Sequence, residues 1–282
     1  MSILTTSYQI PPLTKKFDTQ VTLPGSKSIA LRQLAISALV DGKTILSGIP
    51  ECDDIDAMIE CLGTLGVRIQ RTKNELEISG PIDLSDKTVS INTRMSGAST
   101  RILIGLAALR KGLTRIDGHE SLRKRTNEPL LKTLEQMGCI VKREGVGRPL
   151  EIRGPVMSPE LEIAGNISSQ YVTAILLISP FLNKEENVAI KIKGDLVSKP
   201  YIDITVNEMR KRGLRVRWNG SRDLVVESGT YSDGEYSIEG DATAASYFSA
   251  LATIHNSSVS FPNLGSNTVQ GDYFFFDVME QL

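Results

Sequence analysis

The chain has 282 residues, of which 40% are hydrophobic and 23% are charged, and its formal net charge is −1. This composition is ordinary for a globular protein and leaves room for about two domains. A nearly neutral chain has no global field that attracts nucleic acid. Its apolar helical stretches, about a dozen residues long, are too short to span a bilayer. We therefore expect no nucleic-acid partner and no membrane-spanning segment.

The sequence repeats about every 70 residues, which is a period typical of stacked structural units. Each unit opens with small or polar residues and an apolar helix, followed by a strand, a second helix, a glycine and two strands. The four openings lie at 25–28, 95–99, 166–170 and 240–243. The first helices are predicted at 29–39, 100–109, 171–181 and 244–254.

Short runs of alternating apolar and polar residues between these helices predict strands. They lie at 76–78, 88–91, 150–152, 161–163, 188–192, 214–218 and 224–226. Strands that alternate with helices indicate an α/β protein, and the paired strands that close each unit indicate mixed rather than purely parallel sheets.

Glycine tolerates the left-handed conformation found at helix ends. The second helices of the first three units are followed by such residues, namely Gly66, Gly138 and Gly213. The fourth unit runs through Phe275 and Met279 to Leu282 and stops before its glycine and strands. We therefore expect the chain to be a fragment of a longer protein, the alternative being a natural C-terminus on a terminal helix.

The three cysteines, Cys52, Cys61 and Cys139, are odd in number and lack metal-ligand spacing. This pattern indicates reduced thiols in a cytoplasmic protein. His119 and His255 are the only histidines and lie far apart, so neither a metal site nor a Ser-His-Asp triad is expected. No cofactor is expected either.

Two helix starts have the residues of an anion site. The segment Gly25–Ser28 begins the first helix, where open N–H groups and the positive end of the dipole favour an anion. Ser28 and Arg32 share a helical face, and Lys27 adds a cation. Ser168–Gln170 occupies the equivalent place in the third unit. Simple helix capping by serine is the alternative for both.

Further polar runs precede the second helices. Ser198–Tyr201 combines a hydroxyl, an ammonium and a phenol, and Arg125 ends a similar run at 121–125. Asp53, Asp54 and Asp56 are interpreted as residues of a helix N-terminus rather than metal ligands. The basic cluster at 211–215 is interpreted as a solvated helix face. The cluster at 123–125 lacks interleaved aromatic residues, which argues against nucleic-acid binding.

These segments together resemble the 5-enolpyruvylshikimate-3-phosphate synthase family. The resemblance rests on Pro24–Ser28 with Arg32, and on 121–125, 168–170, 193–203, 239–242 and 267–272. It implies two domains, each an inside-out α/β barrel of three βαβαββ units. The complete domain would span 22–238, and 1–21 plus 239–282 would form part of a second.

The resemblance also implies a transferase of the shikimate pathway, which leads to chorismate and the aromatic amino acids. The enolpyruvyl group of phosphoenolpyruvate passes to the 5-hydroxyl of shikimate 3-phosphate through a tetrahedral ketal. The implied shikimate 3-phosphate contacts are Lys27, Ser28, Arg32, Ser168, Ser169, Gln170, Ser198 and Tyr201. The implied phosphoenolpyruvate contacts are Lys27, Gly97, Arg125 and Gln170.

The chain departs from the usual family sequence at three positions next to these contacts. Met95 and Ala98 stand where Asn and Thr are usual, and Thr126 stands where Pro is usual. The family's acid and base carboxylates lie beyond the position of Leu282, so we expect no catalytic residue and no turnover in this chain.

Two other functions stay open. One is a non-catalytic module that binds shikimate 3-phosphate. The other is the sister enzyme that acts on UDP-N-acetylglucosamine, which usually has Asn where Ser28 stands and a Cys between 92 and 138. The parent protein is expected to be monomeric. In the fragment, the apolar residues at 273–276 lack some partners, so self-association or disorder near the C-terminus is expected.

Overall fold

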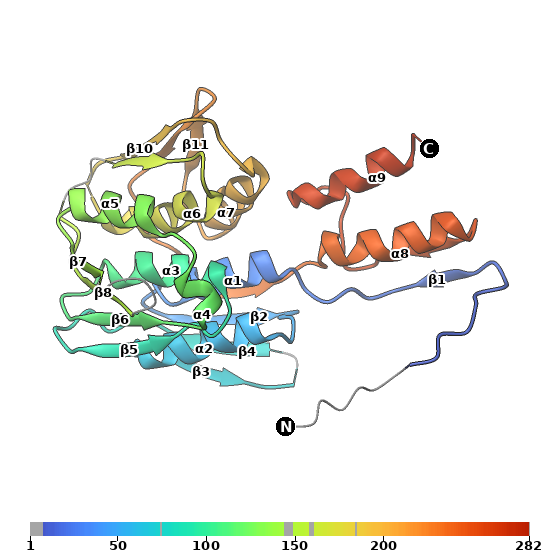
Figure 1. Cartoon of the computed structure of the whole chain (residues 1–282), viewed down its shortest axis with the longest axis horizontal. Coiled ribbons are helices and arrows are strands. Elements are labelled where there is room, and N and C mark those ends of the chain that lie inside the picture. The colour runs from blue at the N-terminus through green and yellow to red at the C-terminus, as the bar shows by residue number, and fades with distance from the viewer. Residues whose placement is uncertain (1–7, 74, 144–148, 158–160, 184, 282) are drawn as a thin grey trace.

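The computed structural model describes residues 8–73, 75–143, 149–157, 161–183 and 185–281. Three sheets and their helices form the main body, and a smaller part projects from one side of it (Figure 1). This smaller part contains β1 (Asp18–Gln20), α8 (Ala242–Ile254), β14 (Ser258–Ser260) and α9 (Phe274–Met279). Leu282, the expected last residue of the fourth unit's apolar face, lies outside the described residues.

The three sheets have four strands each and share one strand order. The first is β13 (Gly234–Ser237), β2 (Lys43–Ser47), β4 (Glu75–Ser79) and β3 (Arg68–Arg71). The second is β5 (Val89–Asn92), β6 (Thr114–Asp117), β8 (Leu150–Arg153) and β7 (Ile140–Arg143). The third is β9 (Leu161–Ala164), β10 (Val188–Lys193), β12 (Asp223–Val226) and β11 (Val216–Asn219). This common order confirms the internal repeat.

Each sheet is mixed, as the paired strands predicted. The first strand runs parallel to the second, and the remaining pairs are antiparallel. In the second and third sheets the parallel edge strand directly precedes its own unit. In the first sheet the edge strand is β13, which pairs Gly234 with Thr44 from the far end of the three-unit segment. The segment therefore closes on itself, a feature that the sequence pattern did not reveal.

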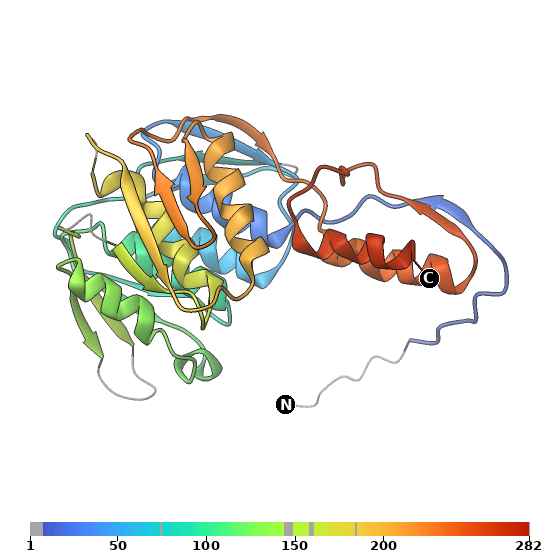
Figure 2. The ribbon, with the colours of Figure 1, turned by 90° about the horizontal axis from the view of Figure 1, so that it is seen from above.

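The first helices of the units lie inside the body. They are α1 (Lys27–Ser37), α3 (Gly97–Ala107) and α6 (Ser169–Ile178), and they pack against one another. Their runs 29–37, 99–107 and 171–178 are buried almost without interruption. The strands instead alternate buried and exposed residues, as β10 does, so one face of each sheet points to solvent. Helices inside and sheets outside confirm the inside-out α/β fold (Figure 2).

The second helices are α2 (Asp53–Thr64), α5 (Glu128–Gln136) and α7 (Lys199–Lys211). The expected glycines follow them with φ values of +98° at Gly66, +96° at Gly138 and +89° at Gly213. These are left-handed conformations, so the predicted helix ends are confirmed. The short helix α4 (Glu120–Arg123) falls outside the repeat pattern, and the predicted helix 171–181 ends in a 3-10 turn, η1 (Ser179–Phe181). Pro180 lacks the N–H needed to continue α6, which explains why the helix tightens there.

The interpretation of 211–215 as a solvated helix face is wrong for Arg212. Its side chain is fully buried below α7. The guanidinium donates hydrogen bonds to Gln33, Thr44 and the Ser232 carbonyl. Its carbon also lies 4.2 Å from the centre of the Tyr236 ring. A basic run gives no sign of such partners, because they come from α1, β2 and the segment beside β13.

The smaller part meets the main body where two chain segments cross side by side. Gly25 and Gly240 form an antiparallel bridge. The Ser26 N–H donates to the Glu239 carbonyl at 2.8 Å, and the Asp241 N–H donates to the Pro24 carbonyl at 2.9 Å. These bonds place the start of α1 beside the start of α8. The division into 22–238 and 1–21 plus 239–282 stays a prediction.

Aromatic side chains hold the smaller part together. Phe261 packs edge-on against Phe276 and Tyr273 packs against it at a tilt, with ring centres 6.3 and 4.9 Å apart. Phe274 is nevertheless 65% exposed and Tyr247 is 75% exposed. The expectation that the residues at 273–276 lack some partners agrees with this exposure, since none of them is buried, although Tyr273, Phe275 and Phe276 contact other aromatic rings. Over the described ranges, no helix is both long enough and apolar enough to cross a bilayer.

Candidate active site at the helix starts

A cavity of about 470 Å³ opens where the starts of α1, α3 and α6 approach the start of α7. Its walls are Lys27, Ser28, Leu31, Arg32, Asp54, Met95, Gly97, Ala98, Ile102, Arg125, Gln170, Thr173 and Tyr201. Seven of these residues were predicted from the sequence as ligand contacts. The first residues of three interior helices therefore line one volume, and helix N-termini favour anions.

The first turn of α1 has no side-chain cap among the described residues. Ser26 occupies the N-cap position, but among the described residues its side chain makes no capping hydrogen bond. Lys27 is half-exposed and forms an ion pair of 2.9 Å with Asp54. That hydrogen bond raises the pKa of Lys27, so the ammonium is charged at neutral pH. Asp54 was predicted only as a helix N-terminal residue, and the structure shows that it also lines the cavity.

Arg32 lines the cavity while its guanidinium is engaged by the protein. Nε donates to Thr205 Oγ1 at 2.7 Å, Nη1 to the Ser28 carbonyl at 2.7 Å and Nη2 to the Tyr201 carbonyl at 2.9 Å. Burial lowers the pKa of Arg32 to about 10. Because this value is still above neutral pH, the guanidinium stays charged there. Arg32 therefore ties α1 to α7 and holds Ser28 and Tyr201 in place.

Gly97 begins α3 between two guanidinium groups. A Cβ at this position would lie 2.8 Å from Arg101 Nη1 and 3.3 Å from Arg125 Nη1. Arg125 is exposed and lines the cavity, and its contact with phosphoenolpyruvate stays a prediction. Met95 is 60% exposed and forms part of an apolar wall, which replaces the polar side chain usual in the resembled family.

The start of α6 contributes one side chain to the cavity. Gln170 lines it, whereas Ser168 and Ser169 do not. Ser168 caps the helix by accepting a hydrogen bond from the Gln170 N–H at 3.2 Å, and Ser169 is buried. The capping alternative therefore describes Ser168 in this structure.

The start of α7 has an unusual backbone. Ser198 has φ 53° and ψ 45°, a left-handed conformation that is uncommon for residues other than glycine. It is followed by Pro200 in the first helical turn, as predicted. Ser198 is not among the residues that line the cavity, but Tyr201 is. Burial raises the pKa of the Tyr201 phenol, so the hydroxyl remains a proton donor at neutral pH.

Sequence reasoning missed the less polar part of the cavity. Leu31, Ile102 and Thr173 line it. Thr173 also bonds Thr205 Oγ1 at 2.9 Å, next to Arg32. A search for residues one helical turn beyond each predicted contact would have found Leu31 and Thr173, because side chains three and four apart share a helical face, but not Ile102, which lies five residues after Gly97.

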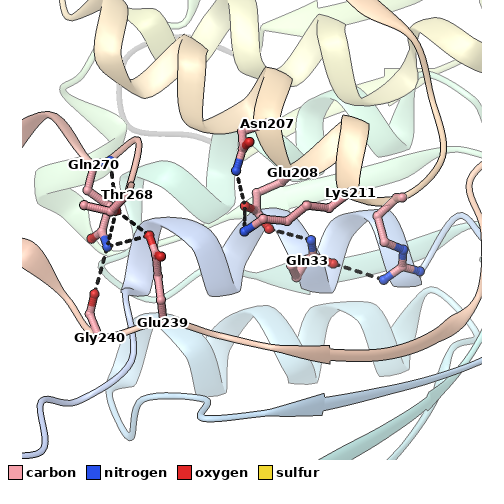
Figure 3. Close-up of polar contacts among 9 residues, drawn as sticks. Gln33, Asn207, Glu208, Lys211, Glu239, Gly240, Thr268 and Gln270 are labelled. Atoms are coloured by element: carbon pink, nitrogen blue, oxygen red, sulfur yellow. Dashed lines mark hydrogen bonds and ion pairs between the residues drawn. The ribbon is translucent and has the colours of Figure 1, made fainter. Parts of the chain in front are cut away.

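The fourth-unit segments at 239–242 and 267–272 contact each other, and the second of them also contacts the start of α7. Pro200 packs against Gly271, where a Cβ would lie 2.6 Å from the proline ring. The Gln270 amide donates to Glu239 at 2.9 Å and to the Gly240 carbonyl at 2.8 Å (Figure 3). The loop before α9 is thereby fixed to the crossing segments. In the part of the chain that is described, no three His, Cys, Asp or Glu residues are placed to hold a metal ion.

The fold and the site define a class of protein: an inside-out α/β barrel of repeated units with a cation-lined cavity at its helix starts. Residues 13–282 match the family model described as EPSP synthase (3-phosphoshikimate 1-carboxyvinyltransferase). The chain belongs to the EPSP synthase family, which confirms the family predicted from the residues.

Individual relatives agree with this assignment. The 3-phosphoshikimate 1-carboxyvinyltransferase of Yersinia ruckeri is 37% identical over 270 residues, which are 93% of this chain and 62% of that protein. The protein of the same name from Hamiltonella defensa is 36% identical, over 95% of this chain and 64% of the relative. This chain thus spans less than two thirds of the length of these curated relatives. The sister enzyme that acts on UDP-N-acetylglucosamine is not favoured.

A solved structure of the EPSP synthase of Acinetobacter baumannii supports the fold. It superposes with a TM-score of 0.80 over 96% of this chain and 60% of that chain. At 24% sequence identity this likeness supports the fold alone.

Proposed function

We propose that this chain binds shikimate 3-phosphate and serves the transfer of the enolpyruvyl group of phosphoenolpyruvate to its 5-hydroxyl. The observation that carries the proposal is the cavity that brings Lys27 and Gln170, at the starts of two interior helices, together with Arg125. Both substrates are polyanions, which favour cations and helix N-termini. The curated relatives are named for this transfer.

The proposed contacts of the two substrates overlap at Lys27 and Gln170 and differ elsewhere. Shikimate 3-phosphate is assigned to Lys27, Ser28, Arg32, Ser168, Ser169, Gln170, Ser198 and Tyr201. Phosphoenolpyruvate is assigned to Lys27, Gly97, Arg125 and Gln170. Preorganised cations at these places would stabilise charge that develops as the ketal forms and as phosphate leaves.

Binding without catalysis is the second candidate function. Asp54 is the one carboxylate among the described residues that line the cavity, and it is paired with Lys27. Proton transfer by a positioned acid or base contributes about 10²–10⁴-fold to a rate. A chain that positions both substrates and lacks such a group would bind them with little or no turnover.

Titration calorimetry tests the binding. We expect shikimate 3-phosphate to bind the 282-residue chain, and Lys27→Ala to weaken that binding about tenfold or more, because it removes a charge-assisted hydrogen bond. Lys43→Ala is the matched control, since Lys43 is paired with Glu77 on the first sheet, outside the residues that line the cavity. Absence of heat at millimolar ligand would contradict the proposal.

An assay of phosphate release from phosphoenolpyruvate separates the two candidates. If the chain carries out the transfer, phosphate is released only when shikimate 3-phosphate is added, and a chain that only binds the two ligands releases none. Release that depends on shikimate 3-phosphate would show that the chain itself is the transferase and would overturn the binding-only alternative.

We also propose a cytoplasmic location and self-association through the smaller part. Burial raises the pKa of Cys61 to about 11, and the three free cysteines suit a reducing compartment.

Ile254 and Tyr247 on α8 are 78% and 75% exposed, and large exposed apolar patches favour association. Sedimentation velocity over a range of concentrations would detect the self-association, and a concentration-independent monomer would contradict it.

A further inference from the structure

Arg101 lies one helical turn after Gly97 on α3, behind the wall of the cavity. It is 6% exposed, and burial lowers its pKa. Its Nη1 donates to the Gly97 carbonyl at 2.9 Å, and its Nη2 donates to the Thr126 carbonyl at 3.3 Å. Among the described residues, Nε has no hydrogen-bond partner. One buried guanidinium therefore joins the start of α3 to the residue that directly follows Arg125.

A second buried donor reaches the same carbonyl. The Tyr171 hydroxyl donates to the Thr126 carbonyl at 2.7 Å from the first turn of α6, and Tyr171 is 2% exposed. Two interior helices thus hold one backbone oxygen between α4 and α5. Because Thr126 is linked to Arg125 by a single peptide bond, fixing this carbonyl fixes the base of the Arg125 side chain.

The position of the Arg125 side chain depends on the hydrogen bonds that hold the Thr126 carbonyl. Its own N–H donates to the Leu122 carbonyl at 2.9 Å, but its side chain is exposed in the cavity. Its Nη1 and that of Arg101 lie on the same side of Gly97, near the position of the missing Cβ. Two guanidinium groups this close repel each other unless an anion joins them. The lining of the cavity around Gly97 is therefore positively charged, which favours the binding of an anion there.

We infer that Arg101 and Tyr171 are positioning residues that hold Arg125 in the cavity through the Thr126 carbonyl, and that Arg101 adds positive charge beneath Gly97. The ligand class is a phosphate-bearing anion. Its assignment as phosphoenolpyruvate rests on the proposed function above.

Three variants separate positioning from general stability. Tyr171→Phe keeps the ring and removes only the donor to Thr126. Arg101→Lys keeps a positive charge and cannot reach both carbonyls with a planar fork. Arg110→Lys is the matched control, since Arg110 is also fully buried just beyond α3 and donates to Asp83 and Lys87 carbonyls away from the cavity.

Calorimetry on the 282-residue chain saturated with shikimate 3-phosphate measures the effect on phosphoenolpyruvate. We expect its Kd to rise about tenfold in Tyr171→Phe and more in Arg101→Lys, because a lost hydrogen bond to a group that orders a charged side chain is worth about a factor of ten. The Kd of shikimate 3-phosphate should change less than twofold, and Arg110→Lys should change neither. Unaltered phosphoenolpyruvate binding in Tyr171→Phe or equal weakening of both ligands would overturn the inference. No phosphoenolpyruvate binding by the unmodified chain would count against the proposed function, and the positioning of Arg125 would then be decided by proteolysis.

The hydrogen bonds from Arg101 and Tyr171 to the Thr126 carbonyl are here called the clamp. Limited trypsin digestion tests this clamp without either substrate. Cleavage at 123–126 should accelerate about tenfold in Tyr171→Phe and Arg101→Lys and stay unchanged in Arg110→Lys, because local opening exposes the segment to the protease. Unchanged cleavage in both clamp variants would overturn the inference. Failure of the unmodified chain to bind shikimate 3-phosphate would count against the proposed function, and the digestion would still decide on the clamp. If Arg101→Lys does not fold, Tyr171→Phe decides both measurements.

Discussion

Replacing Arg212 with alanine is expected to lower the free energy of unfolding by about 3–5 kcal/mol, because it removes one partner of a buried charged network. The guanidinium is fully buried and donates to Gln33, Ser37, Thr44 and Ser232. Gln33 in turn donates to the buried Glu208 carboxylate at 2.6 Å (Figure 3). Truncation would leave these acceptors unpaired around a void. Urea unfolding followed by circular dichroism measures the change.

Arg215→Ala is the matched control three residues away. Its side chain is 84% exposed and lies 3.7 Å from the Glu227 carboxylate. An exposed pair of this kind contributes about 0–1 kcal/mol, so the control should unfold almost as the unmodified chain does. If both substitutions cost equally little, the buried network would not hold α7 against α1 and β2.

Gly25→Ala is expected to lower the free energy of unfolding by roughly 3 kcal/mol and to weaken ligand binding, because overpacking against backbone forces the chain apart. A Cβ on Gly25 would lie 1.8 Å from the Gly48 carbonyl oxygen. Gly25 also bridges Gly240 and directly precedes the start of α1. Relief of the clash would shift Lys27 and Ser28, which line the cavity.

The glycine near the end of α2 supplies the opposite control. A Cβ on Gly63 would have no heavy atom within 4 Å. Gly63→Ala should therefore stabilise the protein by about 0.5–1 kcal/mol, since alanine restricts the unfolded chain and favours the helix. Thermal and urea unfolding of the two variants would show opposite signs. A Gly25→Ala variant as stable as the unmodified chain would contradict the close approach of Gly25 to the Gly48 carbonyl.

The helices and strands of the repeated units could be predicted from the sequence because their signals are local. Apolar spacing marked α1, α3 and α6, and the glycine after each second helix marked its end, as φ +98° at Gly66 confirms. The run at 193–203 and the segments at 24–28 and 168–170 were specific enough to identify the family. Candidate cavity residues at helix starts, such as Lys27 and Gln170, followed from the same local pattern.

Only the tertiary structure decided which polar residues are buried and what they contact. Arg212 was interpreted as part of a solvated helix face, but partners far along the chain surround it. Arg101 is also buried, and it reaches Thr126 beyond its own helix. The closing strand β13 pairs with β2 across most of the chain, a register that no local pattern records. Burial and hydrogen-bond partners depend on contacts between distant segments, whereas helix periodicity and capping depend on neighbours three or four residues apart. The sequence alone therefore determined the family and the candidate cations, and the fold decided which of those cations line the cavity and which hold its walls.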